Sequence, residues 1–348
     1  MSGNVLRIGG YFIAALLLTF SEGVLEIYPE DSQGHSTEKV LVKFKPSALP
    51  AIATFEGYSA GKLKVPGIRE LNPVFSQRKT PSDDLQLWFR VELQEGADSQ
   101  QVLEDLRSHP LVEAAEPEII FHRSQTEDSP PSFTGSDSIP DGQNDPLFSQ
   151  QWYLNAINAS AAWNLLENSG KPAGGDPDLI IAVIDSGVDY NHPDLADNIW
   201  INTAEADGAP GIDDDGNGVI DDIHGANFLG STSGDPMDDS FHGTHIAGII
   251  GMVADNGIGG VGIAYNCQIM PIKASQYNGQ LSSTNIAEAI NYAVQNGADV
   301  INMSFGSSAK SQLVEDALLA AKDSAILVAS AGNQASPNES PLPNAQAY

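Results

Sequence analysis

The sequence is poor in cysteine and in basic residues. Its 348 residues include one cysteine, Cys267, so an intrachain disulfide is excluded. Sixteen Lys and Arg residues stand against 46 Asp and Glu residues, which gives a formal net charge of −30. Nucleic acids and anionic membrane surfaces attract basic proteins, so we expect neither as the main partner. We expect the acidic residues to form a solvated surface, and some of them are suited to binding divalent cations.

A long hydrophobic run is also missing. The apolar stretch over residues 11–20 follows Arg7 and is too short to span a bilayer comfortably, so no stable membrane anchor is expected. A short apolar stretch after a basic residue is typical of a secretory signal. We therefore predict a signal peptide over residues 1–23 and a secreted protein, extracellular or in the cell envelope. A buried N-terminal helix is the alternative.

What is present supports two packed regions joined by a linker. Hydrophobic residues make up 41% of the chain, enough for a core, and the length suits two modest domains. In the first region, residues 39–122, alternating patterns predict strands, and Asp98 is placed to cap a helix that Pro110 stops. This strand, strand, helix, strand order predicts a small α+β domain of ferredoxin-like type. The predicted segments are strands at 39–45, 85–93 and 111–122 and a helix at 98–106.

The segment 123–143 is rich in Ser, Pro, Asp and Gly, which predicts a solvated, cleavable linker. After it, over residues 144–348, buried apolar strands alternate with helical patterns. This alternation predicts an α/β fold with a doubly wound parallel sheet, whose sites lie at the carboxyl ends of the strands. The predicted strands are 178–185, 266–274, 299–306 and 325–333, and the predicted helices are 283–298 and 311–322.

Polar residues fall where these strands end. Asp185 ends one strand, and Ser304 and Asn333 lie at or near the ends of two others. His242 stands at a predicted helix start in D-D-S-F-H-G-T-H-I-A-G, three residues before His245. A zinc pair of the H-E-x-x-H kind needs a spacing of four and a Glu, and neither is present. Convergence of these groups at one sheet edge indicates a reaction centre, with a noncatalytic helix start as the alternative.

The motifs resemble those of subtilisin-like serine proteases (the subtilase family). The resemblance rests on I-A-V-I-D-S-G-V-D-Y-N-H-P-D-L (181–195), H-G-T-H-I-A-G (242–248), I-N-M-S-F-G (301–306) and A-S-A-G-N (329–333). The segment N-D-P-L-F-S-Q-Q-W-Y-L (144–154) resembles the mature N-terminus of secreted members, and 39–122 resembles the family's propeptide. The resemblance implies a subtilisin-like sheet with helices on both faces, a zymogen, and a serine-type endopeptidase acting on protein and peptide substrates.

The resemblance also implies roles for individual residues. His242 is the general base, Asp185 orients it, and Asn333 stabilises the oxyanion, with His245 as a structural neighbour. Two segments are implied to pair with the substrate backbone and accept many sequences. They are Ser304, Phe305 and Gly306 on one side and Asn278, Gly279 and Gln280 on the other. The propeptide is implied to act as an intramolecular inhibitor, and no organic cofactor is expected.

The nucleophile of the triad is absent from residues 1–348. The family carries its serine in G-T-S-M-A, downstream of the oxyanion asparagine, and this motif does not occur in the sequence. We therefore expect the N-terminal part of a preproenzyme, incomplete in its catalytic domain and inactive when taken alone. The alternative is a noncatalytic calcium-binding or protein-binding pseudoprotease module on the same fold.

A second motif, D-x-D-x-N-G, lies between Asp185 and His242. Alternating oxygen ligands followed by a glycine form the first half of an EF-hand-type loop, although the Glu expected at position twelve is replaced by His224. This predicts structural Ca²⁺, with an acidic surface loop as the alternative. The ligands predicted from the motif are Asp213, Asp215, Asn217, the backbone carbonyl of Val219, and Asp222 or Asp221. The family resemblance implies a second site with Asp145, Asp194 and Asn256.

Overall fold

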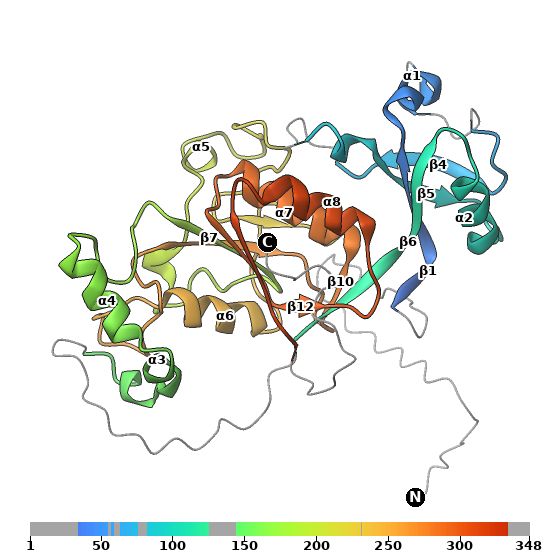
Figure 1. Ribbon diagram of the computed structural model, residues 1–348. Helices are drawn as coiled ribbons and strands as arrows, with labels where there is room; N and C mark the ends of the chain where they lie inside the picture. The colour runs from blue at the N-terminus through green and yellow to red at the C-terminus, as the bar shows by residue number, and fades with distance from the viewer. Residues whose placement is uncertain are drawn as a thin grey trace, which may run out of the picture.

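The computed structural model shows an N-terminal unit whose last strand reaches into a larger unit (Figure 1). The predicted signal peptide, most of the predicted linker and Asn333 lie outside the residues that the structure describes. The described residues are 34–54, 57–58, 63–75, 82–124, 144–230 and 232–332.

The N-terminal unit is an antiparallel sheet with strand order β6-β1-β5-β4. Helix α2 packs on β6 and β1, and its N-terminus is capped by Asp98, which accepts hydrogen bonds from the amides of Gln100 and Gln101. Its elements are β1 (His35–Phe44), α1 (Leu49–Ile52), β2 (Ala53–Thr54), β3 (Gly57–Tyr58), β4 (Ile68–Pro73), β5 (Trp88–Leu93), α2 (Ser99–Arg107) and β6 (Val112–Arg123).

The predicted strands and helix of this unit are confirmed, with small shifts at their ends. Strand β4 was not predicted. It lies at the edge of the sheet, and only two of its six residues, Ile68 and Leu71, are buried, so its apolar pattern is weak.

The larger unit has a five-stranded parallel sheet with strand order β13-β11-β7-β9-β8. This confirms the predicted fold class. Its strands are β7 (Ile180–Asp185), β8 (Ala226–Asn227), β9 (Gln268–Lys273), β11 (Val300–Met303) and β13 (Ile326–Ala329), and two further short strands, β10 (Gln280–Ser282) and β12 (Phe305–Gly306), lie outside it.

One predicted strand is wrong in extent. The segment 299–306 was predicted as a single strand of the parallel sheet, but it divides at Ser304 into β11 and β12. Strand β12 leaves the parallel sheet and pairs antiparallel with β6 of the N-terminal unit. Pairing with β6, which is distant in the sequence, therefore divides this apolar run between two sheets.

Helices cover both faces of the parallel sheet. On one face, α7 and α8 share a core with alternate strand residues such as Ala182 and Ile184. On the other face, α6 packs with Ile181 and Val183. Within the described ranges, no helix combines the length and apolar character needed to cross a membrane. The helices of this unit are α3 (Trp152–Ala156), α4 (Ala159–Asn168), α5 (Thr203–Ala206), α6 (His242–Gly251), α7 (Ser283–Gln295) and α8 (Gln312–Ala321).

Strand β6 joins the two units. Its first half pairs with β1, and its last residues pair with β10 on one side and β12 on the other. Figure 1 shows β6 running from the N-terminal sheet to the edge where the strands of the larger unit end. The end of the N-terminal unit is therefore placed beside the predicted reaction centre.

Candidate active site

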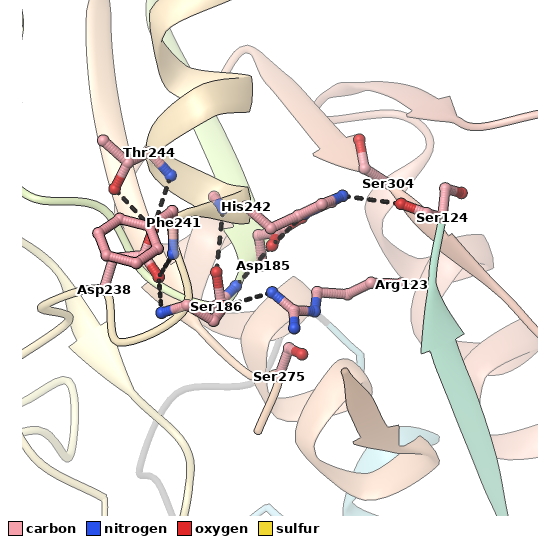
Figure 2. A network of polar contacts seen from close by, with 12 residues as sticks. Arg123, Ser124, Asp185, Ser186, Asp238, Phe241, His242, Thr244, Ser275 and Ser304 are labelled. Carbon is pink, nitrogen blue, oxygen red and sulfur yellow. Dashed lines mark hydrogen bonds and ion pairs between the residues drawn. The ribbon is translucent and has the colours of Figure 1, made fainter. Parts of the chain in front are cut away.

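Asp185 and His242 are brought together, as predicted. Asp185 is the last residue of β7 and is fully buried, whereas His242 is the first residue of α6. His242 Nδ1 lies 2.7 Å from Asp185 Oδ1. The amide of Ser186 donates to the same oxygen at 2.7 Å. Figure 2 shows this pair at the centre of a network of polar contacts. A buried carboxylate thus holds one ring nitrogen and orients the imidazole.

Close packing of α6 against β7 makes this contact possible. A Cβ at Gly243 would lie 2.0 Å from the carbonyl oxygen of Gly187 and 3.1 Å from Asp185 Cβ, so the position has no room for a side chain. The amide of Gly243 donates to Ser186 Oγ at 2.9 Å. The glycine after His242 therefore sets the approach of the helix start to Asp185.

Asp238 organises the loop before the helix. Its carboxylate accepts hydrogen bonds from the amides of Ser240, Phe241 and Thr244 and from the Thr244 hydroxyl. Burial alone would raise the pKa of Asp238, but these bonds and one from Ser186 hold the pKa below its ordinary value. The carboxylate stays charged at the positive end of α6 and stabilises the helix start.

The second nitrogen of His242 contacts the N-terminal unit. Nε2 lies 2.9 Å from the carbonyl oxygen of Ser124, the residue after β6. A carbonyl only accepts, so Nε2 carries a proton here, and Nδ1 carries the proton shared with Asp185. Burial by itself lowers the pKa of His242, but the bond to Asp185, its charge and the Ser124 carbonyl raise the pKa overall. The docked chain favours the imidazolium.

The predicted substrate-binding residues lie on both sides of β6. His122 is opposite Gln280 and Gly306, and Arg123 is opposite Phe305. The amide of Arg123 donates to the Gly279 carbonyl at 2.9 Å, and the amide of Ser124 donates to the Ser304 carbonyl at 2.9 Å. Asn278 supports this side by accepting from the Gln280 amide at 3.1 Å.

Two side chains at the end of β6 are also enclosed. Phe121 is 1% exposed and meets the edge of the Phe305 ring, with ring centres 6.1 Å apart. The Ser124 hydroxyl lies 2.7 Å from the Ser330 hydroxyl. The sequence pattern placed 111–122 in a strand but held no signal for these contacts, because the partners are more than 150 residues away.

The predicted loop ligands come together only in part. Oxygen atoms of Asp213, Asp215 and Glu205 lie within 4.8 Å of one another. Three carboxylates form the donor set that a hard cation such as Ca²⁺ prefers, so the residues fit the predicted ion. Glu205 was missed because it stands on α5, before the D-x-D-x-N-G motif. The only indication of this ligand in the sequence was the glutamate itself in N-T-A-E-A (202–206).

The remaining motif residues anchor the loop. Asn217 donates to Asp215 at 3.0 Å and to Asp222 at 2.9 Å. Asp222 also accepts from Tyr292 of α7 and from Asn202, and burial raises the pKa of Asp222 to about 7. The Val219 side chain is buried in the main core. Three donors engage the Asp222 carboxylate, which lies outside the group of three acids.

The residues of the implied second site also meet. Asp145 accepts from the amides of Asp255, Asn256 and Gly257 at 2.7 to 3.1 Å, and Asn256 Nδ2 donates to Asp194 at 2.8 Å. Burial raises the pKa of Asp194. The structure places the three predicted residues together, and their binding of a cation stays a prediction.

Comparisons with known proteins agree with these motifs. Residues 176–347 match the sequence profile of the subtilase family. The chain is 49% identical over 125 residues to subtilisin-like protease 1 of Plasmodium vivax, covering 36% of this chain and 20% of that protein. It is 33% identical over 236 residues to the thermophilic serine proteinase of Bacillus sp. (strain AK1), covering 68% of this chain and 47% of that protein.

A solved structure shows the same fold. Fervidolysin from Fervidobacterium pennivorans, described as a keratinolytic enzyme related to subtilisin, superposes with a TM-score of 0.58 at 22% sequence identity. The match covers 88% of this chain and 41% of fervidolysin. The chain thus spans less than half the length of each of these three proteins.

Proposed function

Because the chain belongs to the subtilisin-like serine proteases, we propose that it is the precursor form of a secreted endopeptidase that hydrolyses peptide bonds in proteins. One observation carries the proposal. The carbonyl of Ser124 lies 2.9 Å from Nε2 of His242, whose Nδ1 is held by Asp185. The docked chain thus brings a peptide bond to an oriented imidazole, the group that a serine-type peptidase uses as its base.

In the proposed reaction, neutral His242 takes the proton of a serine hydroxyl as the serine oxygen bonds to a substrate carbonyl carbon. Asp185 stabilises the imidazolium, which then gives its proton to the leaving amine as the peptide bond breaks. Water, activated by the same base, hydrolyses the acyl ester and restores the serine. Asn333 is proposed to donate its side-chain amide to the oxyanion.

The serine is proposed to come from outside residues 1–348. No G-T-S-M-A motif occurs in these residues. Among the described serines, none hydrogen bonds to the His242 ring, whose partners are Asp185 and the Ser124 carbonyl. Residues 1–348 taken alone are therefore expected to hydrolyse no peptide.

The N-terminal unit is proposed to be an inhibitory propeptide. Its strand β6 uses the main-chain groups of Gly279 and Ser304 that a substrate would pair with. Its Ser124 carbonyl also keeps Nε2 of His242 protonated, and a protonated nitrogen cannot accept the serine proton. Maturation is proposed to break the peptide bond between Ser124 and Gln125, because the carbonyl of that bond faces the base.

Calcium and secretion complete the proposal. The oxygen atoms of Glu205, Asp213 and Asp215 would hold Ca²⁺ as a structural ion, which would tie the loop to the sheet and supply no catalytic chemistry. Secretion is supported by the short apolar stretch over residues 11–20, which is typical of a signal peptide.

The test is expression of the full-length coding sequence beside residues 1–348, with casein hydrolysis and N-terminal sequencing as readouts. The full-length protein should cleave casein and yield a product that begins at Gln125, whereas residues 1–348 should do neither. Asp185→Asn should lower turnover by about 10⁴-fold, the usual cost of losing this group in serine proteases. Asp178→Asn, an exposed change just before the same strand, is the matched control and should process normally.

Casein cleavage by residues 1–348 that Asp185→Asn abolishes would contradict the placement of the nucleophile. A full-length protein with no hydrolysis and no processing would support the noncatalytic module instead.

A further inference from the structure

Arg123 is bound in a way that the proposed reaction does not require. Its Nη1 donates to the hydroxyl of Ser240, in the loop before α6. Its Nη2 donates to the carbonyl of Tyr277 at 3.1 Å. Figure 2 shows the guanidinium turned back toward the loop that precedes His242, on the side opposite Ser304. The backbone of Arg123 is held separately, through its amide and the Gly279 carbonyl. The side-chain contacts are therefore additional to main-chain pairing.

The backbone at Gly279 leaves room for the guanidinium. Gly279 has φ +90°, a conformation that residues with a side chain rarely adopt. A Cβ built there would lie 3.4 Å from Arg123 Nε and 3.5 Å from Nη2. A larger side chain at this position would occupy the place of the guanidinium. The segment at Gly279, which pairs with β6, thus also forms one wall of the space that holds the Arg123 side chain.

The two acceptors suit arginine better than lysine. Ser240 Oγ and the Tyr277 carbonyl receive protons from two different nitrogens of one planar group. A guanidinium presents several donors in a fixed plane, whereas an ammonium is a single point of charge on a more freely rotating stem. The net charge of −30 also favours a cation over a neutral side chain.

The position of this charge argues against a role in proton transfer. The Arg123 charge lowers the pKa of His242, which opposes the imidazolium that forms during the reaction. A cation beside His242 therefore disfavours the protonated base that must form during the reaction. Recognition of the side chain gives a reason for it to be there.

We propose that Ser240, the Tyr277 carbonyl and Gly279 form a subsite that selects arginine at the residue immediately before the scissile one. Ser124 is the scissile residue of the docked strand, so Arg123 occupies this subsite in the precursor. The substrate class is then protein segments with Arg followed by a small residue at the cut. This inference rests on the proposed peptidase function.

The experiment uses the full-length protein and decapeptides with the sequence of residues 118–127, E-I-I-F-H-R-S-Q-T-E. Three peptides carry Arg, Lys or Ala at the position of Arg123. The Arg peptide should be cleaved after Ser124 with kcat/KM about tenfold or more above the Ala peptide, the difference expected for one hydrogen bond to a charged group. The Lys peptide should lie between them.

Ser240→Ala should reduce the ratio of the Arg to the Ala peptide several-fold, because one of the two acceptors is lost. Thr232→Ala is the matched control, since it removes an exposed hydroxyl earlier in the segment that leads to α6, and it should keep the ratio. Equal kcat/KM for the Arg and Ala peptides, or a ratio that Ser240→Ala leaves unchanged, would overturn the subsite while leaving the peptidase function intact.

A protein that cleaves none of the peptides would overturn the peptidase function, and the subsite is then tested by docking alone. Arg123→Ala and Arg123→Lys are made in the full-length protein, and hydrogen exchange is followed at the amide of Ser124. Protection should fall by about tenfold with Ala and less with Lys. Equal protection in all three proteins would overturn the subsite.

Discussion

Glu116 of strand β6 caps helix α8 of the other unit, and its removal should loosen the docking of the N-terminal unit. Its carboxylate accepts hydrogen bonds from the Ser311 hydroxyl at 2.8 Å, the Gln312 amide at 2.8 Å and the Leu313 amide at 3.2 Å. These amides belong to the first turn of α8, where the free N–H groups and the helix dipole favour an anion. The perturbation is Glu116→Ala.

The magnitude follows from these contacts. A hydrogen bond to a charged group contributes about 1.5 to 3 kcal/mol, and a carboxylate at a helix N-terminus adds about 0.3 to 1 kcal/mol. Ser311 still caps α8, because its hydroxyl accepts from the Val314 amide at 3.3 Å, so the helix itself should survive. Glu116 is half-buried, and water replaces part of what is lost. We expect docking to weaken by about 2 to 4 kcal/mol, or about 30- to 1,000-fold.

Glu116→Gln separates the charge from the hydrogen bonds. Burial raises the pKa of Glu116, although the bonds from α8 oppose this. The loss of hydration of the carboxylate therefore offsets part of the free energy that its hydrogen bonds contribute to docking. A neutral amide oxygen still accepts, and we expect an effect smaller than that of Ala. Glu104→Ala, on the exposed face of α2, is the matched control and should leave docking unchanged.

The assay is hydrogen exchange resolved by residue in the intact chain. The amides of Arg123 and Ser124 bond to carbonyls of the larger unit, so their exchange reports undocking of β6. Both should exchange about 30- to 1,000-fold faster in Glu116→Ala. Faster exchange confined to Gln312 and Leu313, with Arg123 and Ser124 unchanged, would contradict this role, since Glu116 would then cap the helix without holding the strand.

The loop ion and the pH response give two further predictions. A ligand bound only by the folded state stabilises it by about 2.7 kcal/mol at 100 times its Kd, so Asp213→Ala with Asp215→Ala should reduce the rise in Tm on adding calcium. The exposed change Asp207→Ala should keep that rise, and a full calcium response in the double variant would contradict the site. The bond to Asp185 and its charge do most to raise the pKa of His242, and the Ser124 carbonyl raises it further when β6 is docked, so the protonated imidazole favours docking and this contribution is lost as pH rises through the folded pKa. Protection of the Ser124 amide should therefore fall as pH rises above about 6.5, the ordinary pKa of histidine, and protection independent of pH would exclude the imidazolium contact.

Much of the fold was predictable because its signals are local. The apolar run before Asp185 and the spacing of the helix at 283–298 reflect which face of each element is buried, and burial repeats with the period of the element. Asp98 caps α2 through amides two and three residues away, so the motif and its partners lie within one turn.

The contact between Asp185 and His242 could also be predicted from the sequence. Asp185 ends a buried strand and His242 starts a helix with a glycine behind it, and parallel sheets bring such positions to one edge. The role of Asn333 stays a prediction, because this residue lies outside the described part of the chain. Glu205 was missed because its partners, Asp213 and Asp215, meet it only after the loop folds back on α5.

Most of the elements, the parallel sheet and the Asp185–His242 pair could therefore be predicted from the sequence, because their signals are patterns of burial and short motifs. Tertiary structure alone decided that β12 pairs with β6, that Ser124 faces His242 and that Arg123 lies between Ser240 and Tyr277. These contacts join segments more than 110 residues apart and depend on the register of one strand between two others. Strand register is set by the whole sheet and its neighbours, so no local pattern encodes it.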